Sequence, residues 1–101
     1  MIDEIVAEMG SLFRNGVFSK KTSFRFTVDG TTITVILEAQ SYTVEKQSTI
    51  AKADCSCKTS AEIFHKIWYD GYKPGLMDFF GGAIQTDQPF MLPQFLQAFG
   101  K

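Results

Sequence analysis

The apolar positions at the start of the chain recur every three or four residues. They are Ile2, Ile5, Val6, Met9, Leu12 and Phe13. Because this spacing gathers them into one stripe, it predicts an amphipathic helix over residues 2–14 that ends at Asn15-Gly16. The opposite face of this helix is acidic, which disfavours its binding to an anionic membrane surface.

After this helix, apolar and polar residues alternate, which is typical of strands with one buried face. The alternation predicts a strand over residues 23–28, a tight turn at Asp29-Gly30 and a second strand over residues 31–38. A weaker third strand, suited to a sheet edge, is expected over residues 42–47, and a fourth strand over residues 50–58.

The side chains on the second face of these strands are almost all polar. They are Arg25, Thr27, Thr32, Thr34, Glu38, Thr43, Glu45, Gln47, Lys52, Asp54, Ser56 and Lys58, with Ile36 as the apolar exception. We expect a sheet with this pattern to expose that face to water and to need an apolar cover on the other face.

A helix that would supply this cover is predicted directly after the fourth strand. The stretch from Thr59 to Glu62 fits a capping box, in which the Thr59 hydroxyl and the Glu62 carboxylate satisfy free backbone N–H groups. Gly71 is expected to end this helix. Its apolar stripe consists of Ile63, Phe64, Ile67 and Trp68.

The stretch KPGLMDFFGGAIQTD, residues 73–87, combines a proline, three glycines and several large apolar side chains. Pro74 suits the first turn of a short helix, and Gly81-Gly82 breaks helical geometry before a fifth strand over residues 83–86. We interpret this stretch as a hydrophobic roof over the sheet. Asp87 is then expected to cap a final apolar helix.

Length and composition favour a single folded domain over residues 1–101. Apolar residues make up 45% of the chain and include ten Phe, which is enough for a sizeable core. Ten basic and eleven acidic residues, without a basic cluster, argue against a nucleic-acid partner. Because the sequence lacks an apolar run of about 20 residues, we expect a soluble, cytoplasmic protein with at most transient membrane contact.

No group of residues in the sequence is typical of a catalytic site, a metal site or a cofactor site, so we expect none and do not expect an enzyme. Cys55 and Cys57 would share one face of a strand, and we interpret them as reduced, buried thiols; a metal site shared by two chains is the alternative. His65 is expected to be exposed. Asp70 and Asp78 are separated by a glycine and a proline, so nothing indicates an acid–base pair.

The order of the expected elements, together with certain turn, cap and packing positions, resembles the sterol carrier protein 2 family of small lipid-binding domains. The resemblance covers about residues 20–101. The positions that carry it are Ala53, Asp54, the helix from Thr59 to Tyr69, Gly71, Pro74, Phe80, Gly82, Ile84 and Asp87.

This resemblance implies an α+β fold with a five-stranded, mostly antiparallel sheet whose helices cover one face and enclose an apolar tunnel. It implies noncatalytic binding, or transfer, of a hydrophobic ligand such as a fatty acid, an acyl-CoA or a sterol. The sequence leaves open whether the chain forms a homo-oligomer. The candidate wall of the tunnel consists of Phe26, Ile33, Val35, Trp68, Met77, Phe80, Met91, Phe95 and Phe99.

An empty tunnel would be costly in so small a domain. At about 24 cal/mol per Å³ of unfilled volume, a pocket of roughly 300 Å³ costs on the order of 7 kcal/mol, against a net stability of about 5–15 kcal/mol. We therefore expect the space to hold a ligand, to collapse or to open on binding. The alternative is a structural or protein-interaction domain of the same fold with a filled core.

Overall fold

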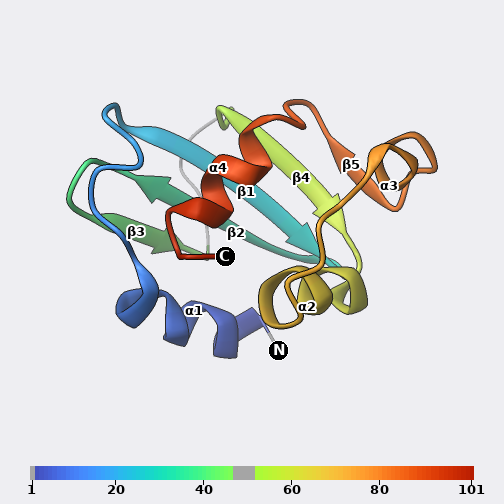
Figure 1. Cartoon of the computed structure of the whole chain (residues 1–101), viewed down its shortest axis with the longest axis horizontal. Coiled ribbons are helices and arrows are strands. Elements are labelled where there is room, and N and C mark those ends of the chain that lie inside the picture. Colours follow the sequence, from blue (N-terminus) through green and yellow to red (C-terminus); the bar gives the residue numbers. More distant parts are fainter. Residues whose placement is uncertain (1, 47–51) are drawn as a thin grey trace.

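The structure is a computed structural model of the chain and describes residues 2–46 and 52–101, with Ile2 described by its backbone only. These residues form a five-stranded sheet and four helices. In chain order the elements are α1 (Ile2–Leu12), β1 (Thr22–Val28), β2 (Thr31–Leu37), β3 (Tyr42–Glu45), β4 (Cys55–Thr59), α2 (Ala61–Tyr69), α3 (Leu76–Phe80), β5 (Ile84–Thr86) and α4 (Met91–Gln97) (Figure 1).

The strands lie in the order β3-β2-β1-β4-β5, and the sheet is mostly antiparallel, with β1 and β4 as its parallel pair. The expected turn at Asp29-Gly30 joins β1 to β2 with φ of 46° and 84°, the left-handed conformations that a tight hairpin requires. The resulting register places Phe24 opposite Val35 and Phe26 opposite Ile33. These side chains therefore share one apolar face of the sheet.

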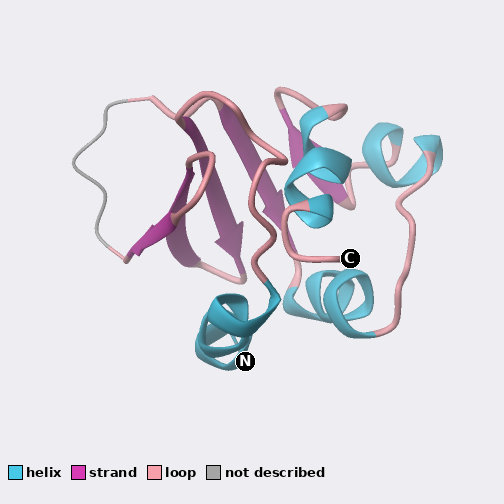
Figure 2. Ribbon diagram, turned by 60° about the vertical axis from the view of Figure 1, so that its left-hand side comes forward, coloured by secondary structure: helices cyan, strands magenta, loops and turns pink. Residues whose placement is uncertain are grey.

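Three of the helices lie on this apolar face (Figures 1 and 2). Helix α4 lies over β1 and β4, α1 and α2 close one end of the same layer, and α3 stands beside β5 at the sheet edge. The α+β fold with helices on one face is therefore as expected from the sequence. None of the helices in the described part of the chain is long and apolar enough to cross a bilayer.

The core between sheet and helices is built mainly from aromatic rings. Phe95 of α4 lies 5.1 Å from Phe24 and 4.7 Å from Phe26, measured between ring centroids. Phe99 lies 5.2 Å from Phe95 and 5.7 Å from Trp68. All five rings are less than 2% exposed. Rings at these separations attract one another beyond their area burial, so they tie α2 and α4 to β1.

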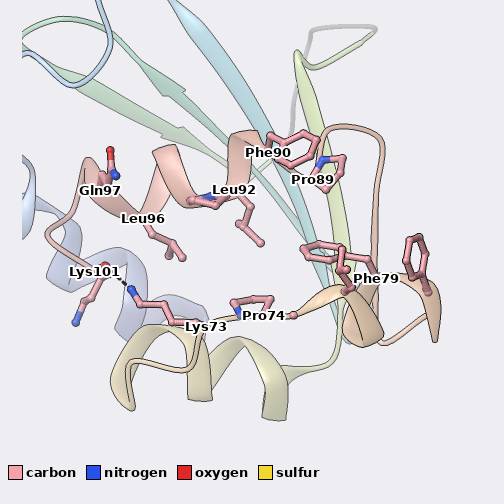
Figure 3. A pocket seen from close by; sticks show the side chains of 13 residues that line it. Lys73, Pro74, Phe79, Pro89, Phe90, Leu92, Leu96, Gln97 and Lys101 are labelled. Carbon is pink, nitrogen blue, oxygen red and sulfur yellow. Dashed lines mark hydrogen bonds between the residues drawn. The ribbon is translucent and has the colours of Figure 1, made fainter.

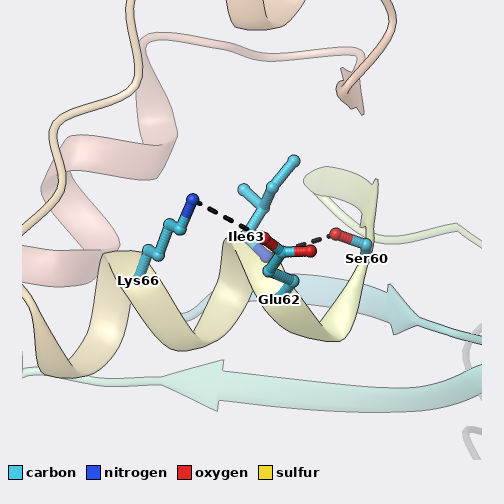
Figure 4. A network of polar contacts seen from close by, with 4 residues as sticks. All are labelled: Ser60, Glu62, Ile63 and Lys66. Carbon is cyan, nitrogen blue, oxygen red and sulfur yellow. Dashed lines mark hydrogen bonds and ion pairs between the residues drawn. The ribbon is translucent and has the colours of Figure 1, made fainter.

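Ser60, rather than Thr59, caps α2. The backbone N–H of Ile63 donates to Ser60 Oγ at 3.2 Å (Figure 4). The expected cap was one residue too early because Thr59 is still paired in the sheet as the last residue of β4. The Glu62–Lys66 ion pair beside this cap, at 3.7 Å, is exposed and contributes little to stability.

The fourth strand is shorter than expected, because β4 begins at Cys55. Residues 52–54 lie outside the strand, and residues 50–51 lie outside the described part of the chain. Asp54 is nevertheless fixed beside β1, since its carboxylate accepts the Ser23 N–H at 2.9 Å and its own N–H donates to Ser23 Oγ at 3.0 Å. Side-chain hydrogen bonds replace the strand pairing that the alternation had predicted.

Asp87 stabilises the sheet edge and does not cap α4. Its carboxylate accepts the Ser56 N–H at 2.8 Å, and its N–H donates to the Ser56 carbonyl at 3.3 Å. The residue in the N-cap position of α4 is Phe90, and the helix begins at Met91. Pro93 falls in the first turn, where its missing N–H removes no helical hydrogen bond.

The outer face of the sheet is not exposed throughout. Thr34 is 0% exposed and Ile36 is 9% exposed, so the expectation that Thr34 faces water is wrong. Strand β2 lies inside the sheet, and the register places Thr34 between Arg25 of β1 and Glu45 of β3. Long neighbours on both sides distinguish this central position from the edge positions, where polar residues do reach solvent.

We expect Phe95→Ala to lower the free energy of unfolding by about 3–5 kcal/mol, because it removes a fully buried ring with several aromatic neighbours. Phe90→Ala is the control, because Phe90 is 88% exposed; it should change that free energy by less than about 0.5 kcal/mol. Urea denaturation followed by circular dichroism measures both. A loss below about 1 kcal/mol for Phe95→Ala would contradict a close-packed aromatic core.

Ser60→Ala should lower the free energy of unfolding by about 1 kcal/mol, because it leaves the Ile63 N–H without its acceptor. Ser19→Ala, in an exposed loop, is the matched control and should have no measurable effect. Thermal and urea denaturation measure the free energy of unfolding of the two variants. Equal stability of both would mean that α2 does not depend on this cap.

Candidate functional site

An apolar groove of about 640 Å³ opens between α4 and the segment that carries α3 (Figure 3). It is lined by Lys73, Pro74, Gly75, Leu76, Phe79, Phe80, Pro89, Phe90, Leu92, Pro93, Leu96, Gln97 and Lys101. Most of these side chains are apolar. The groove therefore offers an apolar surface, and Leu92 and Leu96 of its lining belong to the same buried cluster as the aromatic rings.

Helix α4 and the turn that follows it carry two pairs of buried apolar side chains. Phe95 and Phe99, four residues apart, point into the aromatic core and are 0% exposed. Leu92 and Leu96, also four residues apart, form the floor of the groove (Figure 3). They are buried as well, so the floor is firmly packed against the protein.

The opposite side of the groove is held by hydrogen bonds around Asp78 of α3. Its carboxylate accepts the Tyr72 hydroxyl at 2.6 Å and the Gly75 N–H at 2.7 Å. These bonds lower the pKa of Asp78, with Tyr72 as the larger cause, and the same contact raises the pKa of Tyr72. Pro74, which was expected in the first turn of α3, instead precedes the N-cap residue Gly75 and lines the groove.

Three large apolar side chains at the groove are in water. Leu76 is 72% exposed, Phe80 is 81% exposed and Phe90 is 88% exposed. They come from α3 and from the residue before α4, so they lie on both sides of the groove. Exposed apolar residues that gather around a concavity are typical of a binding surface, whereas single exposed residues are common everywhere.

The polar residues of the lining gather at one end. Figure 3 shows Lys73, Gln97 and Lys101 at the end opposite Pro89 and Phe90. Lys73 Nζ donates to the Lys101 carbonyl oxygen at 3.3 Å. This bond joins the segment before α3 to the segment after α4, so it closes the polar end of the groove.

Comparisons with known proteins identify the fold. No family model matches the sequence, and no curated protein matches it. The stereoselective inverting sec-alkylsulfatase Pisa1 from Pseudomonas sp. matches in structure with a TM-score of 0.83 at 13% identity, over 100% of this chain and 16% of the sulfatase chain. The UbiJ-SCP2 ubiquinone synthesis protein matches with a TM-score of 0.69 at 15% identity, over 95% of this chain and 85% of that chain. The chain has a sterol carrier protein 2-like fold.

Within this sterol carrier protein 2-like fold, the nine residues expected to line a tunnel lie in different places. Six of them are in the packed core: Phe26, Ile33, Val35, Trp68, Phe95 and Phe99. Phe80 lines the groove. Met91 is half-buried beside the core, and Met77 is 79% exposed on α3 without lining the groove. The structure thus brings six of the nine together as core and one to the groove.

Sequence reasoning missed most of the groove. It did single out the stretch over residues 73–87 as unusually apolar, and this stretch supplies one side of the groove. It did not single out Pro89 and Phe90, which follow Asp87 at the start of the expected final helix. A run of large apolar residues directly after a polar turn was the available signal for Phe90.

A second hollow, of about 370 Å³, lies over the outer face of β1, β4 and β5. It is lined by Arg25, Thr27, Ser56, Cys57, Lys58, Gln85, Thr86 and Asp87. The Asp87 carboxylate is already bound to the Ser56 N–H, and the Thr27 hydroxyl lies 3.0 Å from that of Thr32. In the described part of the chain, no three or more His, Cys, Asp or Glu side chains are grouped so that they could hold a metal ion.

The other reactive groups lie away from the groove lining. His65 is exposed, as expected, and its ring lies 4.6 Å from that of Tyr69 on the same helix. Cys55 and Cys57 are free and buried. Burial raises the pKa of Cys57 to about 12 and also raises that of Cys55. Both thiols are therefore protonated near neutral pH, which makes them poor nucleophiles.

We expect neither cysteine to be alkylated rapidly by iodoacetamide at pH 8 in the folded protein, because both are less than 6% exposed and their pKa values are raised. Unfolding in urea should expose both to reaction, since a free thiol has a pKa of about 8.5. Intact-mass spectrometry counts the adducts. The same raised pKa values should make stability fall as pH rises above about 9. Rapid labelling of the native protein would contradict their burial.

Proposed function

We propose that the chain is a noncatalytic module that binds a hydrophobic small molecule in the groove between α3 and α4. The observation that carries this proposal is an apolar groove of about 640 Å³ flanked by exposed side chains. Pockets for small ligands commonly have about 300–1,000 Å³ and mostly apolar walls. An open groove also permits transfer of its ligand, because release requires no unfolding.

Burial of the exposed groove residues would supply the affinity. Full burial of one Leu or Phe side chain is worth about 1.5–3 kcal/mol. Leu76, Phe80 and Phe90 are each more than two-thirds exposed, so most of this free energy is available to a ligand. The same residues contribute little to the folded state, which leaves binding as the process that would use them.

The chemistry of the lining supports binding over catalysis. Its polar side chains are those of Lys73, Gln97 and Lys101, and the described lining contains no carboxylate, imidazole, thiol or hydroxyl. General acid–base or nucleophilic catalysis normally relies on such groups. The fold neighbours support the same ligand class, since the name of one refers to an alkyl-bearing substrate and the name of the other to a quinone.

A second candidate function is contact with another protein. Met77 is 79% exposed on α3 but does not line the groove, so apolar surface continues beyond the groove. The packed aromatic core also agrees with a domain of this fold that holds no ligand between sheet and helices. The two candidate functions predict different sensitive residues, which are Met77 for contact with a protein and Phe80 for binding of a ligand.

Phe80→Asp should weaken binding of the neutral dye N-phenyl-1-naphthylamine at least about tenfold, because it replaces an apolar wall with a charge. Met77→Asp is the matched control, since Met77 is on the same helix and equally exposed but outside the groove lining. It should bind the dye as the unmodified protein does. Dye fluorescence measures both, and circular dichroism confirms that both variants fold.

Native mass spectrometry of freshly purified protein provides a second readout, with one bound hydrophobic molecule expected per chain. Absence of any bound mass together with absence of saturable dye binding would overturn the proposal. Equal loss in both variants would favour a broader apolar contact surface. Loss of self-association or of a protein contact in Met77→Asp alone would favour the second candidate function.

A further inference from the structure

Four large apolar side chains at and near α3 are far more exposed than the other large apolar side chains in the described part of the chain. Leu76 is 72% exposed, Met77 is 79%, Phe80 is 81% and Phe90 is 88%, whereas the others reach at most 38%. Three of the four line the groove, and Met77 follows Leu76 directly on α3. We refer to these four residues as the α3 face. A group of this kind marks an interaction site, whereas single exposed apolar residues are normal.

The α3 face has no partner within the chain because α3 lies at the periphery of the fold. The helix stands beside β5 at the edge of the sheet, and no other element of the described residues lies beyond it in Figures 1 and 2. Phe79 packs against the core. The helix therefore uses this side chain for the fold and presents Leu76, Met77 and Phe80 to solvent.

The sequence around the α3 face contains few charges. Residues 74–100 include two charged residues, Asp78 and Asp87, although 21% of the whole chain is charged. Both carboxylates are already hydrogen-bonded, that of Asp78 within its own segment and that of Asp87 to the Ser56 N–H. The lysines of the groove lie at the end opposite Phe90 (Figure 3). A two-fold contact brings the same patch of two copies together, so a charged patch would repel itself and an uncharged one does not.

The α3 face is large enough for a weak homodimer. An aromatic side chain can bury about 150–250 Å², so the four exposed side chains together offer on the order of 600 Å². A standard interface buries about 800 Å² per partner, and interfaces near or below about 1,200 Å² in total are typical of weak, transient contacts. Aromatic residues and Met are enriched in protein interfaces, and charged residues are depleted from their centres.

We propose that a second copy of this chain docks on the α3 face, with the two α3 helices packed against each other around a two-fold axis. Leu76, Phe80 and Phe90 also line the groove, so each copy covers part of the groove rim of the other. A ligand in the groove and a second copy then use the same side chains, and each weakens binding of the other. This inference goes beyond the proposed function, because the dimer does not require a ligand.

Sedimentation velocity between about 1 μM and 1 mM measures self-association, and we expect a dissociation constant on the order of 10–100 μM. Phe80→Asp and Met77→Asp should each raise this constant at least about tenfold, because each substitution places a charge on both sides of the contact. Thr43→Asp is the matched control, since Thr43 is exposed on β3, at the opposite edge of the sheet from β5. It should leave the constant within about twofold. Circular dichroism confirms that the variants fold.

A cross-linking experiment tests which surface makes the contact. Cys55 and Cys57 are free but buried, so a cysteine introduced on the surface is the thiol that reacts with a short bismaleimide linker. Met77→Cys should yield a covalent dimer. Thr43→Cys, treated in the same way, should remain monomeric on a denaturing gel.

The outcomes separate this inference from the proposed function. A protein that remains monomeric at the highest concentration would overturn the dimer and leave the groove as a ligand site. Self-association that is lost in Thr43→Asp but kept in Phe80→Asp would also overturn it, because the contact would then lie at the β3 edge.

Saturating N-phenyl-1-naphthylamine should shift the dimer toward monomer. A dimer that forms only with the dye or a copurified hydrophobic molecule bound would overturn the inference, because the ligand would then cover the α3 face. Failure of the dye to bind the monomer would count against the proposed function alone.

Discussion

Packing of aromatic rings between the sheet and the helices is the interaction on which the rest of the structure depends. Phe95 reaches two rings of β1 and the ring of Phe99, just after its own helix, at centroid distances between 4.7 and 5.2 Å. Protein interiors are close-packed, so rings this near to one another leave little room for a guest between them. The groove, which is lined by residues of α4 and of the segment around α3, lies outside this layer of rings.

The sequence around α4 determines which apolar side chains pack among the aromatic rings and which line the groove. Phe95 and Phe99 repeat at one four-residue spacing and Leu92 and Leu96 at another, so α4 and the turn after it present two pairs of apolar side chains. Both pairs belong to the buried core, and Leu92 and Leu96 also form the floor of the groove. The other wall does not depend on apolar packing to the same degree, since Asp78 fixes α3 through polar bonds. Because these hydrogen bonds fix α3, its apolar side chains can remain exposed to solvent.

Most of the fold could be predicted from the sequence because its signals are local. The alternation before and after Asp29-Gly30 identifies the hairpin, and Gly71 and Gly81-Gly82 mark helix ends. The errors occur at residues whose structure is determined by contacts with a segment distant in the sequence. Thr59 looked like a cap, but its pairing with Ile84 keeps it in the sheet, and Asp87 looked like a cap but is bound to the backbone of Ser56.

The site was harder to predict than the fold, since apolar periodicity shows that a side chain avoids water but not which layer buries it. Trp68 and Phe26 were expected in a tunnel wall and lie in the packed core, while Phe90, the N-cap residue of α4, was not among the expected site residues. Exposure of Leu76 and Phe90 on two sides of one groove depends on how far α3 stands from α4. That separation depends on the tertiary structure, and the spacing of residues within either segment does not determine it.

The complete core has a consequence for how a ligand would act on the domain. Since the rings around Phe95 bury one another, a ligand in the groove is not part of this aromatic packing. Leu76 and Phe80 are exposed in this state, so a ligand that covers them binds the folded chain and not the unfolded one. Mass action then raises stability by RT ln(1 + [L]/Kd), about 2.7 kcal/mol at a hundredfold excess over Kd. Binding in the groove would thus add stability without replacing part of the aromatic core, in contrast to a tunnel ligand between sheet and helices.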